Sequence, residues 1–291
     1  DTRIFVANYH ALTAPIDSQT PEELRESTID VAIDYLAIGL DPQKVNIFLQ
    51  TSVPEVSELM WIFDCITTVP YLQRAHSYKD AVAKKEEINV GTFNYPLLMA
   101  ADILIQDADV VPVGADQKQH LEIARDTAEK FNRLFGETFK LPEPIIMEDV
   151  KTVPGLDGRK MSKSYGNTIP LFAEDEEIKK AVMSIVTDSK APEEPKDPQE
   201  DNIFALHKLF STNELPDIEK RYKEGGMGYK QSKEILIKNV VSFIAPLREK
   251  RKEIAKDKDA VLKILENSGN IAHSTAKAKM MEVRERVGLS I

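Results

Sequence analysis

Short apolar runs alternate with longer amphipathic segments along the first half of the chain. The runs Arg3–Ala7, Val45–Leu49 and Asp109–Val113 have the length and composition of buried strands, and Ile145–Met147 is a shorter candidate. The segments between them carry apolar residues at helical spacing. Strands that alternate with helices predict an α/β fold built on an open, doubly wound parallel sheet.

The helix that follows the first strand has a clear start. Thr20 to Glu23 form a capping box, in which Thr20 caps the helix, Pro21 takes the first helical position and Glu23 reaches back. The helix is predicted to end at Gly39. Its apolar stripe is expected to comprise Leu24, Val31, Tyr35 and Ile38. Further helices are predicted from Ser52 and Pro54 through Trp61 and Cys65, from Pro96 to Ile105, and from Asp116 to Phe131.

The pattern changes after about Leu171, where no further strand is predicted. Helices are expected over residues 174–187, after a cap at Asp201, and along a long stripe that carries Leu236, Val240, Phe243 and Leu247. We therefore expect an α/β domain at residues 1–170 and an all-helical domain at residues 171–291.

Charge and composition narrow the classes of partner. The net charge is −10 and 30% of the 291 residues are charged, so we expect no DNA partner, and RNA binding only through local basic patches. No apolar stretch approaches the roughly 18 residues of a membrane-spanning helix, so no membrane partner is expected. The basic residues that cluster in the second half are Arg248, Lys250, Arg251 and Lys252, and then Lys277, Lys279, Arg284 and Arg286. Either cluster, taken alone, is more typical of a solvated helix face than of an RNA-binding surface.

A single cysteine, Cys65, excludes an internal disulfide and suits the reducing cytosol, so a cytoplasmic protein is expected. Cys65 lies in an apolar helical pattern, which predicts a buried side chain. The first residues lack the basic start and long apolar core of a signal peptide. The five histidines form no Cys/His pattern, so no metal site on the protein is expected.

The stretch from Gly155 to Asn167 is rich in glycine, lysine and serine. Such a segment predicts a loop that carries two ammonium groups, from Lys160 and Lys163, and several backbone N–H groups to an anion such as phosphate. The alternative is a solvated basic loop. The string K-M-S-K-S, from Lys160 to Ser164, favours phosphate binding because it matches the phosphate-binding loop of class I aminoacyl-tRNA synthetases.

Two further positions carry candidate chemistry. Asp116 follows a strand and Gly114, at the edge of a parallel sheet where ligands bind, so it is either a receptor for ribose hydroxyls or a simple helix cap. Asp102 lies on one helix face with Met99 and Ile103. A carboxylate on an apolar face needs a donor, either inside the protein or on a mostly apolar ligand.

Five sequence strings together resemble the bacterial-type tryptophanyl-tRNA synthetases, a family of class I aminoacyl-tRNA synthetases. They are L-M-A-A-D-I-L (98–104), V-P-V-G-A-D-Q-K-Q-H (111–120), R-D-T-A-E-K-F-N (125–132), K-M-S-K-S (160–164) and V-T-D-S (186–189). The resemblance extends over essentially the whole chain. It implies a Rossmann-like catalytic domain, a helical insertion at about residues 52–95 that forms a homodimer interface, and a helical anticodon-binding domain.

The resemblance also implies residue roles. Asp102 accepts the indole N–H, and Met99, Ile103, Val111 and Val113 line the indole pocket. Tyr95 and Gln117 hold the amino-acid end of tryptophan, with His10 close by. Gly114, Ala115 and Asp116 meet the adenosine of ATP, and Val153 touches adenine. Lys160 and Lys163 are the catalytic residues that grip pyrophosphate, within the loop that Met161, Ser162 and Ser164 complete.

The implied reaction joins L-tryptophan and ATP, with Mg²⁺ on the phosphates, and then transfers the aminoacyl group to tRNA(Trp). The family also has an H-I-G-H-type motif on its first strand and helix, which is absent from these 291 residues, so we expect the sequence to begin inside the domain. In the strand order 3-2-1-4-5, Arg3–Ala7 and Asp109–Val113 would then not be hydrogen-bonded to each other.

Two alternatives remain open at this point. Tyrosyl-tRNA synthetases share the fold and the lysine loop, and a phenol would also fit an Asp receptor. A non-catalytic RNA-binding protein descended from a synthetase would explain the absent motif. Met99 beside Asp102 and the 111–120 run favour tryptophan.

Overall fold

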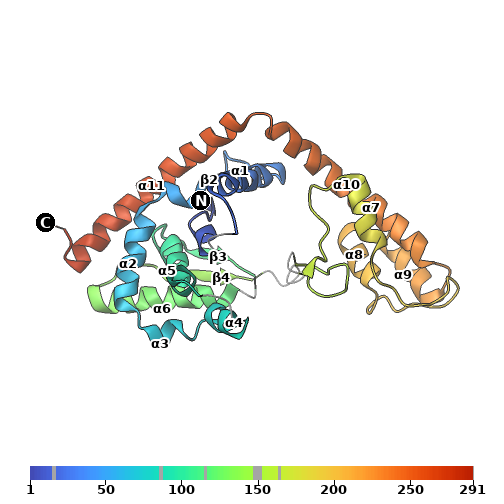
Figure 1. Ribbon diagram of the computed structural model, residues 1–291, viewed down its shortest axis with the longest axis horizontal. Helices are drawn as coiled ribbons and strands as arrows, with labels where there is room; N and C mark the ends of the chain where they lie inside the picture. Colours follow the sequence, from blue (N-terminus) through green and yellow to red (C-terminus); the bar gives the residue numbers. More distant parts are fainter. Residues whose placement is uncertain (15–17, 85–87, 115–116, 147–152, 163–164, 291) are drawn as a thin grey trace. The chain divides into compact units, whose positions relative to one another are not determined.

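The computed structural model describes residues 1–291 except 15–17, 85–87, 115–116, 147–152, 163–164 and 291. The chain forms two compact units (Figure 1). Unit 1 comprises Asp1–Lys151 and Asp257–Ile291, and unit 2 comprises Thr152–Lys256. Among the helices so described, none is both long and apolar enough to cross a membrane.

Unit 1 contains two pairs of parallel strands. The strands β1 (Thr2–Val6) and β2 (Val45–Leu49) pair with Ile4 opposite Ile47, and β3 (Val110–Pro112) and β4 (Glu143–Ile145) form the second pair. In the part of the chain that the structure describes, β1 and β3 lie in different sheets and share no hydrogen bonds. This confirms the prediction that the two strands are not direct neighbours.

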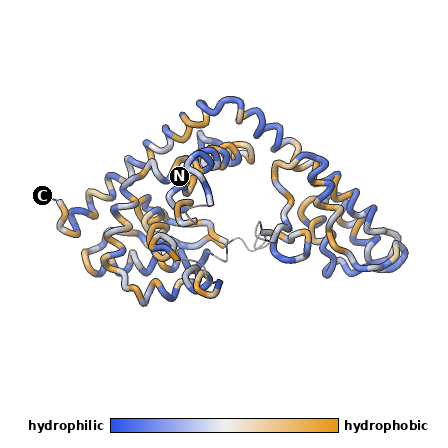
Figure 2. The backbone as a smooth tube through the Cα atoms, viewed as in Figure 1, coloured by the Kyte–Doolittle hydropathy of each residue, from blue (hydrophilic) through white to orange (hydrophobic). Residues whose placement is uncertain are grey.

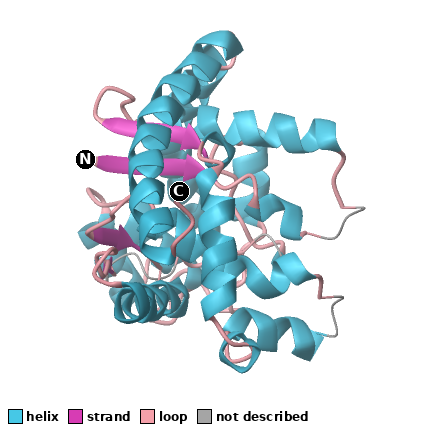
Figure 3. Ribbon diagram, turned by 90° about the vertical axis from the view of Figure 1, so that its left-hand side faces the viewer, coloured by secondary structure: helices cyan, strands magenta, loops and turns pink. Residues whose placement is uncertain are grey.

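The sheets of unit 1 are covered by helices (Figures 1 and 3). The α-helices of this unit are α1 (Pro21–Ala37), α2 (Glu55–Ile66), α3 (Val69–Leu72), α4 (His76–Lys84), α5 (Val90–Leu104), α6 (Lys118–Phe135) and α11 (Lys258–Val287). Two 3₁₀ helices follow the ends of these strands: η1 (His10–Thr13) comes shortly after β1, and η2 (Gln50–Ser52) directly follows β2. The core joins α2, α5 and α6 around Phe63, Leu97 and Phe131, all fully buried.

Helix α11 packs across β2, η2 and α2 because its facing residues are small (Figure 3). A side chain at Gly269 would meet Ser52 at 2.8 Å, and Ala272 and Ala276 are completely buried one and two turns later. Small residues let the helix approach the sheet closely, and Met280, which is also completely buried, continues the same stripe. The last helix of the chain is therefore part of the core of unit 1.

Unit 2 is helical and consists of α7 (Asp175–Met183), α8 (Asn202–Phe210), α9 (Leu215–Glu224) and α10 (Tyr229–Ile254). Its core is formed where α7 and α8 pack against α10, and the apolar residues of these helices face one another (Figure 2). Ile178, Leu206 and Leu236 are fully buried there. As predicted, Asp201 caps α8, and its carboxylate accepts the N–H of Phe204 at 2.7 Å.

The predicted division at residue 170 differs from the compact units. The phosphate-loop segment after Thr152 belongs to the helical unit, because Leu156 and Ile169 pack on the α7–α8–α10 core. Residues 257–291 belong to unit 1, because α11 completes its core. The sequence predicts only that residues 171–291 are helical, and that pattern cannot show which core the apolar stripe of α11 covers.

Some packing predictions were wrong. The capping box of α1 is present, but α1 buries Ala32, Ile33 and Leu36, whereas Val31 and Ile38 are 36% and 46% exposed. The buried stripe of α1 therefore lies beside the predicted one and includes two large apolar residues, Ile33 and Leu36. Other residues expected inside are exposed, namely Cys65 on α2 and Phe243 on α10.

Helix α5 begins earlier than predicted. Asn89 caps it by accepting the N–H of Thr92 at 2.8 Å, and Pro96 lies inside the helix rather than at its start. A proline in a helix removes one hydrogen bond. Here Pro96 and the next residue, Leu97, are buried, so packing of this face offsets the loss. The helix thus brings Tyr95 onto the same rigid element as Asp102.

Candidate active site

A buried polar cluster lies where β1, β2 and α5 meet in unit 1. Gln50, 1% exposed, directly follows β2 and donates from Nε2 to Oδ2 of Asp102 at 2.7 Å. The same Nε2 lies 2.9 Å from Nδ1 of His10, and Oε1 of Gln50 accepts the N–H of Tyr9 at 2.9 Å. A single amide therefore fixes both the carboxylate of α5 and the turn that follows β1.

Burial determines the charge of this cluster. Desolvation raises the pKa of Asp102 well above its usual range, and the hydrogen bond from Gln50 opposes that rise. Desolvation lowers the pKa of His10, which leaves its ring neutral at neutral pH. Nδ1 of His10 lies 3.9 Å from Oδ2 of Asp102, so the imidazole is a polar neighbour of the carboxyl group rather than a counter-ion.

Tyr95 and His120 extend the polar wall from α5 to α6. The hydroxyl of Tyr95 lies 3.0 Å from Nε2 of His120, and their rings are 5.3 Å apart. The ring of Tyr95 also meets His10 edge-on at 6.1 Å. Because Tyr95 and Asp102 are seven residues apart on one helix, they share a face. The structure therefore brings His10, Tyr95 and Asp102 together, as the prediction requires.

The four apolar residues expected around an indole belong to one core. Ile103 is 8% exposed and forms part of that core, and Met99, Val111 and Val113 are half-buried against it. The N–H of Val113 donates to Ile145 O at 3.0 Å, which holds the end of β3 against β4. These residues therefore belong to the same apolar core as α5, the helix that carries Asp102.

The segment after β3 leads into α6. Gly114 is exposed, and its carbonyl accepts the N–H of Gln117 at 2.9 Å. Gln117 caps α6, which begins at Lys118, two residues later than predicted. Ala115 and Asp116 lie outside the described residues, so the choice between ribose receptor and helix cap at Asp116 stays a prediction.

The lysine loop belongs to unit 2 and forms a short hairpin. An antiparallel bridge joins Pro154 to Lys160, and the N–H of Met161 donates to Val153 O at 2.8 Å. The side chain of Lys160 is exposed and Ser162 is half-buried. Lys163 and Ser164 lie outside the described residues. The backbone pairing of this hairpin therefore fixes the position of Lys160, the first lysine of the loop.

Sequence reasoning missed Gln50 and Asn167. Gln50 is the first residue after a parallel strand, the position where such sheets bind ligands, and that position was the available clue. Asn167 is 3% exposed and its side chain contacts three parts of the lysine loop. Nothing in its spacing distinguished it from an ordinary turn residue.

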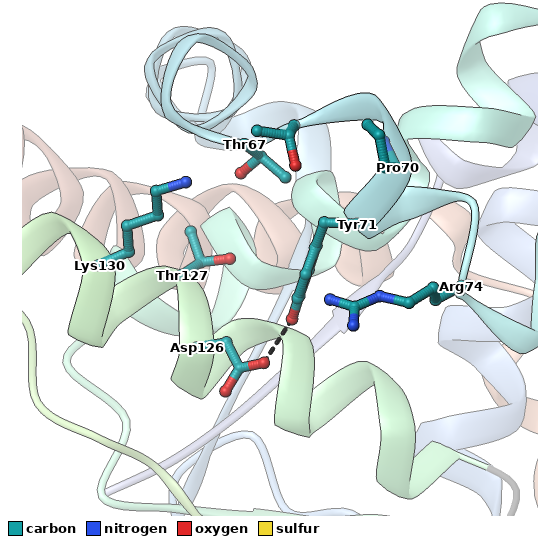
Figure 4. A pocket seen from close by; sticks show the side chains of 8 residues that line it. Thr67, Pro70, Tyr71, Arg74, Asp126, Thr127 and Lys130 are labelled. Atoms are coloured by element: carbon teal, nitrogen blue, oxygen red, sulfur yellow. Dashed lines mark hydrogen bonds between the residues drawn. The ribbon is translucent and has the colours of Figure 1, made fainter.

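A separate cavity of about 320 Å³ lies between α3 and α6 (Figure 4). It is lined by Thr67, Thr68, Pro70, Tyr71, Arg74, Asp126, Thr127 and Lys130. The Tyr71 hydroxyl donates to Asp126 Oδ2 at 2.6 Å, and the guanidinium of Arg74 lies 5.1 Å from the centre of the tyrosine ring. None of the predicted site residues lines this cavity, which lies between the predicted helical insertion and α6.

Comparison with known proteins identifies relatives over nearly the whole chain. A family model described as class I tRNA synthetases (W and Y) matches residues 1–245. A tryptophan–tRNA ligase from Fusobacterium nucleatum is 49% identical over 290 residues, covering 98% of this chain and 87% of that protein. A Campylobacter jejuni tryptophanyl-tRNA synthetase, whose crystal structure contains ADP and tryptophan, is 45% identical with a TM-score of 0.89, covering 98% and 88% of the two chains.

A more distant solved structure shows the fold alone. The tyrosyl-tRNA synthetase from Archaeoglobus fulgidus, complexed with L-tyrosine, is 21% identical with a TM-score of 0.63, covering 86% of this chain and 79% of that one. The chain thus belongs to the class I tRNA synthetases of the tryptophan and tyrosine (W and Y) family. The predicted Rossmann-like α/β fold with a helical second part is confirmed.

Proposed function

We propose that this protein activates L-tryptophan with ATP and transfers the product to tRNA(Trp), which makes it an aminoacyl-tRNA ligase. One observation carries the proposal. A buried carboxyl group, Asp102, lies beside an apolar wall in a chain whose relatives named tryptophan–tRNA ligase are 42–49% identical. An indole is apolar except for one N–H, so one acceptor in an apolar pocket matches its chemistry.

The roles of the pocket residues follow from that match. Asp102 accepts the indole N–H, and Met99, Ile103, Val111 and Val113 supply the apolar contacts. Tyr95 and Gln117 bind the ammonium and carboxylate end, with His10 beside them. Gln50 holds the Asp102 carboxyl group in place through the 2.7 Å hydrogen bond. The carboxyl group therefore does not depend on the ligand alone for a donor.

ATP is the second substrate. Gly114, Ala115, Asp116 and Val153 contact its adenosine, and the loop from Lys160 through Met161, Ser162, Lys163 and Ser164 contacts its phosphates. The tryptophan carboxylate attacks the α-phosphorus in line and expels pyrophosphate. Because the nucleophile is already an anion, no protein base is needed. Catalysis then consists of positioning and of stabilising the charge that builds on the leaving group.

Mg²⁺ would enter with the ATP phosphates. Over the described residues, no group of three or more His, Cys, Asp or Glu side chains could hold a metal ion. Mg²⁺ binds readily through phosphate oxygens and water with few protein ligands, so the donor set of this chain fits such a mode. When bound, the ion neutralises phosphate charge. The chain's own contribution is the ammonium groups and N–H groups of the lysine loop.

Transfer requires tRNA, which we place on the helical unit at the anticodon end, in a homodimer formed through residues 52–95. Several of the clustered basic side chains are already used inside the protein. Arg248 is 7% exposed and pairs with Asp175 at 2.9 Å, and Nε of Arg284 lies 2.8 Å from Oε1 of Glu58. RNA contacts would then come from exposed lysines, such as Lys250, rather than from these arginines.

Pyrophosphate exchange tests the proposal directly. The complete protein should exchange labelled pyrophosphate into ATP when tryptophan is supplied, and much less when tyrosine replaces it. Exchange only with tyrosine would identify a tyrosyl enzyme instead. A complete protein that binds tRNA but exchanges with neither amino acid would be a non-catalytic relative.

A further inference from the structure

We propose that Asn167 is a positioning residue for the lysine loop, which it holds in its phosphate-binding shape before ATP arrives. The inference rests on the proposed function, because that function gives the loop its task. It adds a residue that does not itself need to touch ATP.

The side chain of Asn167 joins three points of the loop. Its Oδ1 accepts the N–H of Ser162 at 2.7 Å. Its Nδ2 donates to Asp157 Oδ1 at 2.7 Å and to the carbonyl of Lys160 at 3.1 Å. Its own carbonyl accepts the N–H of Leu156 at 3.0 Å. The amide thus ties both sides of the hairpin to the residue where the loop ends.

The residue is buried although it lies in a polar loop. Asn167 is 3% exposed, so loss of a partner would leave a buried amide group of Asn167 unsatisfied. Lys160 and Ser162, on either side of Met161, are both reached by the same amide. Their backbone is therefore fixed while the lysine side chain stays exposed to a ligand.

Gly155 gives an independent sign of the same contact. A Cβ built on Gly155 would meet the side chain of Asn167, with Cγ only 2.5 Å away. Gly155 has no positive φ that would itself require glycine. The space beside Gly155 is therefore needed by the Asn167 side chain, which fits only where the neighbouring strand of the hairpin lacks a side chain.

Asp157 completes the arrangement. Its Oδ1 accepts from Asn167, and its Oδ2 accepts from Nε of Arg159 at 2.8 Å. The donor groups of Asn167 and Arg159 hold the pKa of Asp157 down, at about 2, so it is ionised at neutral pH. An ionised acceptor makes the Asn167–Asp157 bond charge-assisted, which stiffens the turn opposite Lys160.

The test compares Asn167→Ala and Asn167→Asp with a matched asparagine elsewhere. Asn132 in unit 1 also bridges a turn, since its Oδ1 accepts from Thr138 and Phe139, both at 3.0 Å. Its Nδ2 donates to Phe139 O at 2.8 Å. Asn132→Ala therefore removes an amide with equivalent chemistry that is remote from the loop in sequence and lies in the other unit.

We expect kcat for tryptophan-dependent pyrophosphate exchange to fall about 10- to 100-fold in both Asn167 variants, because small misplacements of catalytic groups cost rates of this order. Tryptophan affinity, measured by calorimetry, should stay within about twofold, since Asn167 is not part of the tryptophan pocket. Asn132→Ala should lower the melting temperature without lowering kcat. Gly155→Ala should reproduce the kcat loss and add little to Asn167→Ala in the double variant.

The outcomes separate this inference from the proposed function. An unaltered protein that shows no exchange overturns both. An active protein whose Asn167 variants keep the normal kcat overturns only the positioning role, as does a kcat loss equal to that of Asn132→Ala. Asn167→Asp keeps the size and the acceptor of asparagine, so it still gives an answer if the alanine variant fails to fold.

Discussion

In unit 1, Gln50 and Asp102 of the proposed tryptophan pocket are buried and hydrogen-bonded to each other, and His10 and Tyr95 are half-buried. In unit 2, the side chain of Lys160 in the lysine loop is exposed, and hydrogen bonds hold the backbone of that residue. The first arrangement favours selection, because a buried acceptor left unpaired by the wrong ligand is costly. The second favours catalysis, because exposed charge on a fixed backbone can meet phosphate wherever it becomes most negative. Under the proposed function, selection and catalysis are thus assigned to different parts of one chain, which are built in different ways.

The largest expected effect is on the catalytic side. Lys163→Ala should lower kcat for adenylate formation by about 10²- to 10³-fold, because its ammonium group matters most as charge builds on pyrophosphate. Tryptophan affinity should change little. Single-turnover kinetics measures the two separately, with Lys238→Ala, an exposed lysine of α10, as the control. An unchanged kcat with only a raised KM for tryptophan would contradict this role for Lys163.

The next effect concerns selection. Asp102→Asn should weaken the preference for tryptophan over phenylalanine by about 1.5–3 kcal/mol, the usual worth of a hydrogen bond to a charged group. Competition in pyrophosphate exchange measures the preference. Unchanged tryptophan affinity and unchanged discrimination would remove Asp102 from the pocket.

The same carboxyl group gives a pH prediction. Burial raises the pKa of Asp102 above its unfolded value, so ionisation costs folding stability at neutral pH, and this cost disappears as the pH falls through the raised pKa. Asp102→Asn should therefore melt at a higher temperature than the unaltered protein at pH 7, with the difference shrinking in acid. Tryptophan affinity of the unaltered protein should fall on acidification, and that of the variant should not. Calorimetry measures both, and identical pH profiles would show that Asp102 does not titrate in this range.

A smaller effect is expected at Gln50. Gln50→Met keeps the length of the side chain but removes the donor to Asp102. We expect tryptophan affinity to fall about tenfold, equivalent to about 1.4 kcal/mol, and the pKa of Asp102 to rise further. The kcat at saturating tryptophan should be nearly unchanged, which contrasts with the lysine-loop variants. Equal losses in kcat and affinity would contradict the prediction that Gln50 acts on tryptophan binding alone.

The smallest effect on activity is expected at His207, the single histidine between residues 152 and 256, which is fully buried. His207 accepts or donates to Ser211 at 2.7 Å and Ser232 at 3.0 Å, and desolvation lowers its pKa to about 4. Between pH 6.5 and 4 the unfolded chain binds a proton at this residue that the folded chain does not. As the pH is lowered through this window, the free energy of unfolding therefore decreases by up to about 1.4 kcal/mol per pH unit. His207→Gln should flatten that slope in denaturant titrations without changing exchange activity at pH 7.5.

Much of the chain could be predicted because local rules and tertiary structure agree. The capping box of α1, the cap at Asp201 and the apolar runs of β1 and β2 all appear where expected. The predictions failed where a choice depended on residues far away in sequence. Which face of α1 is buried depends on the elements that pack against it, α11 and β1. Whether Pro96 starts or interrupts a helix depends on how well that helix is packed.

The site shows the same limit. Motifs identified the candidate ligand-binding residues, such as Asp102 and Lys160, because their chemistry is unusual for their positions. Gln50 donates a hydrogen bond to Asp102, which is 52 positions away. Asn167 donates one to the carbonyl of Lys160, which is seven positions away. A supporting amide leaves no periodic pattern and no charge in the sequence. It becomes visible only when the backbone brings it to the group that it holds.

The return of α11 to unit 1 makes unit 2 an insertion within another folded unit. The chain enters unit 2 after residue 151 and leaves it after residue 256, so both ends of unit 2 are covalently tied to unit 1. A single protease cut at either crossing therefore cannot release unit 2 as a free fragment. After a cut at the second crossing, the 35-residue piece that contains α11 would remain attached through the burial of Ala272, Ala276 and Met280. Unit 1 cannot form its complete core during synthesis until the last residues of α11 have left the ribosome.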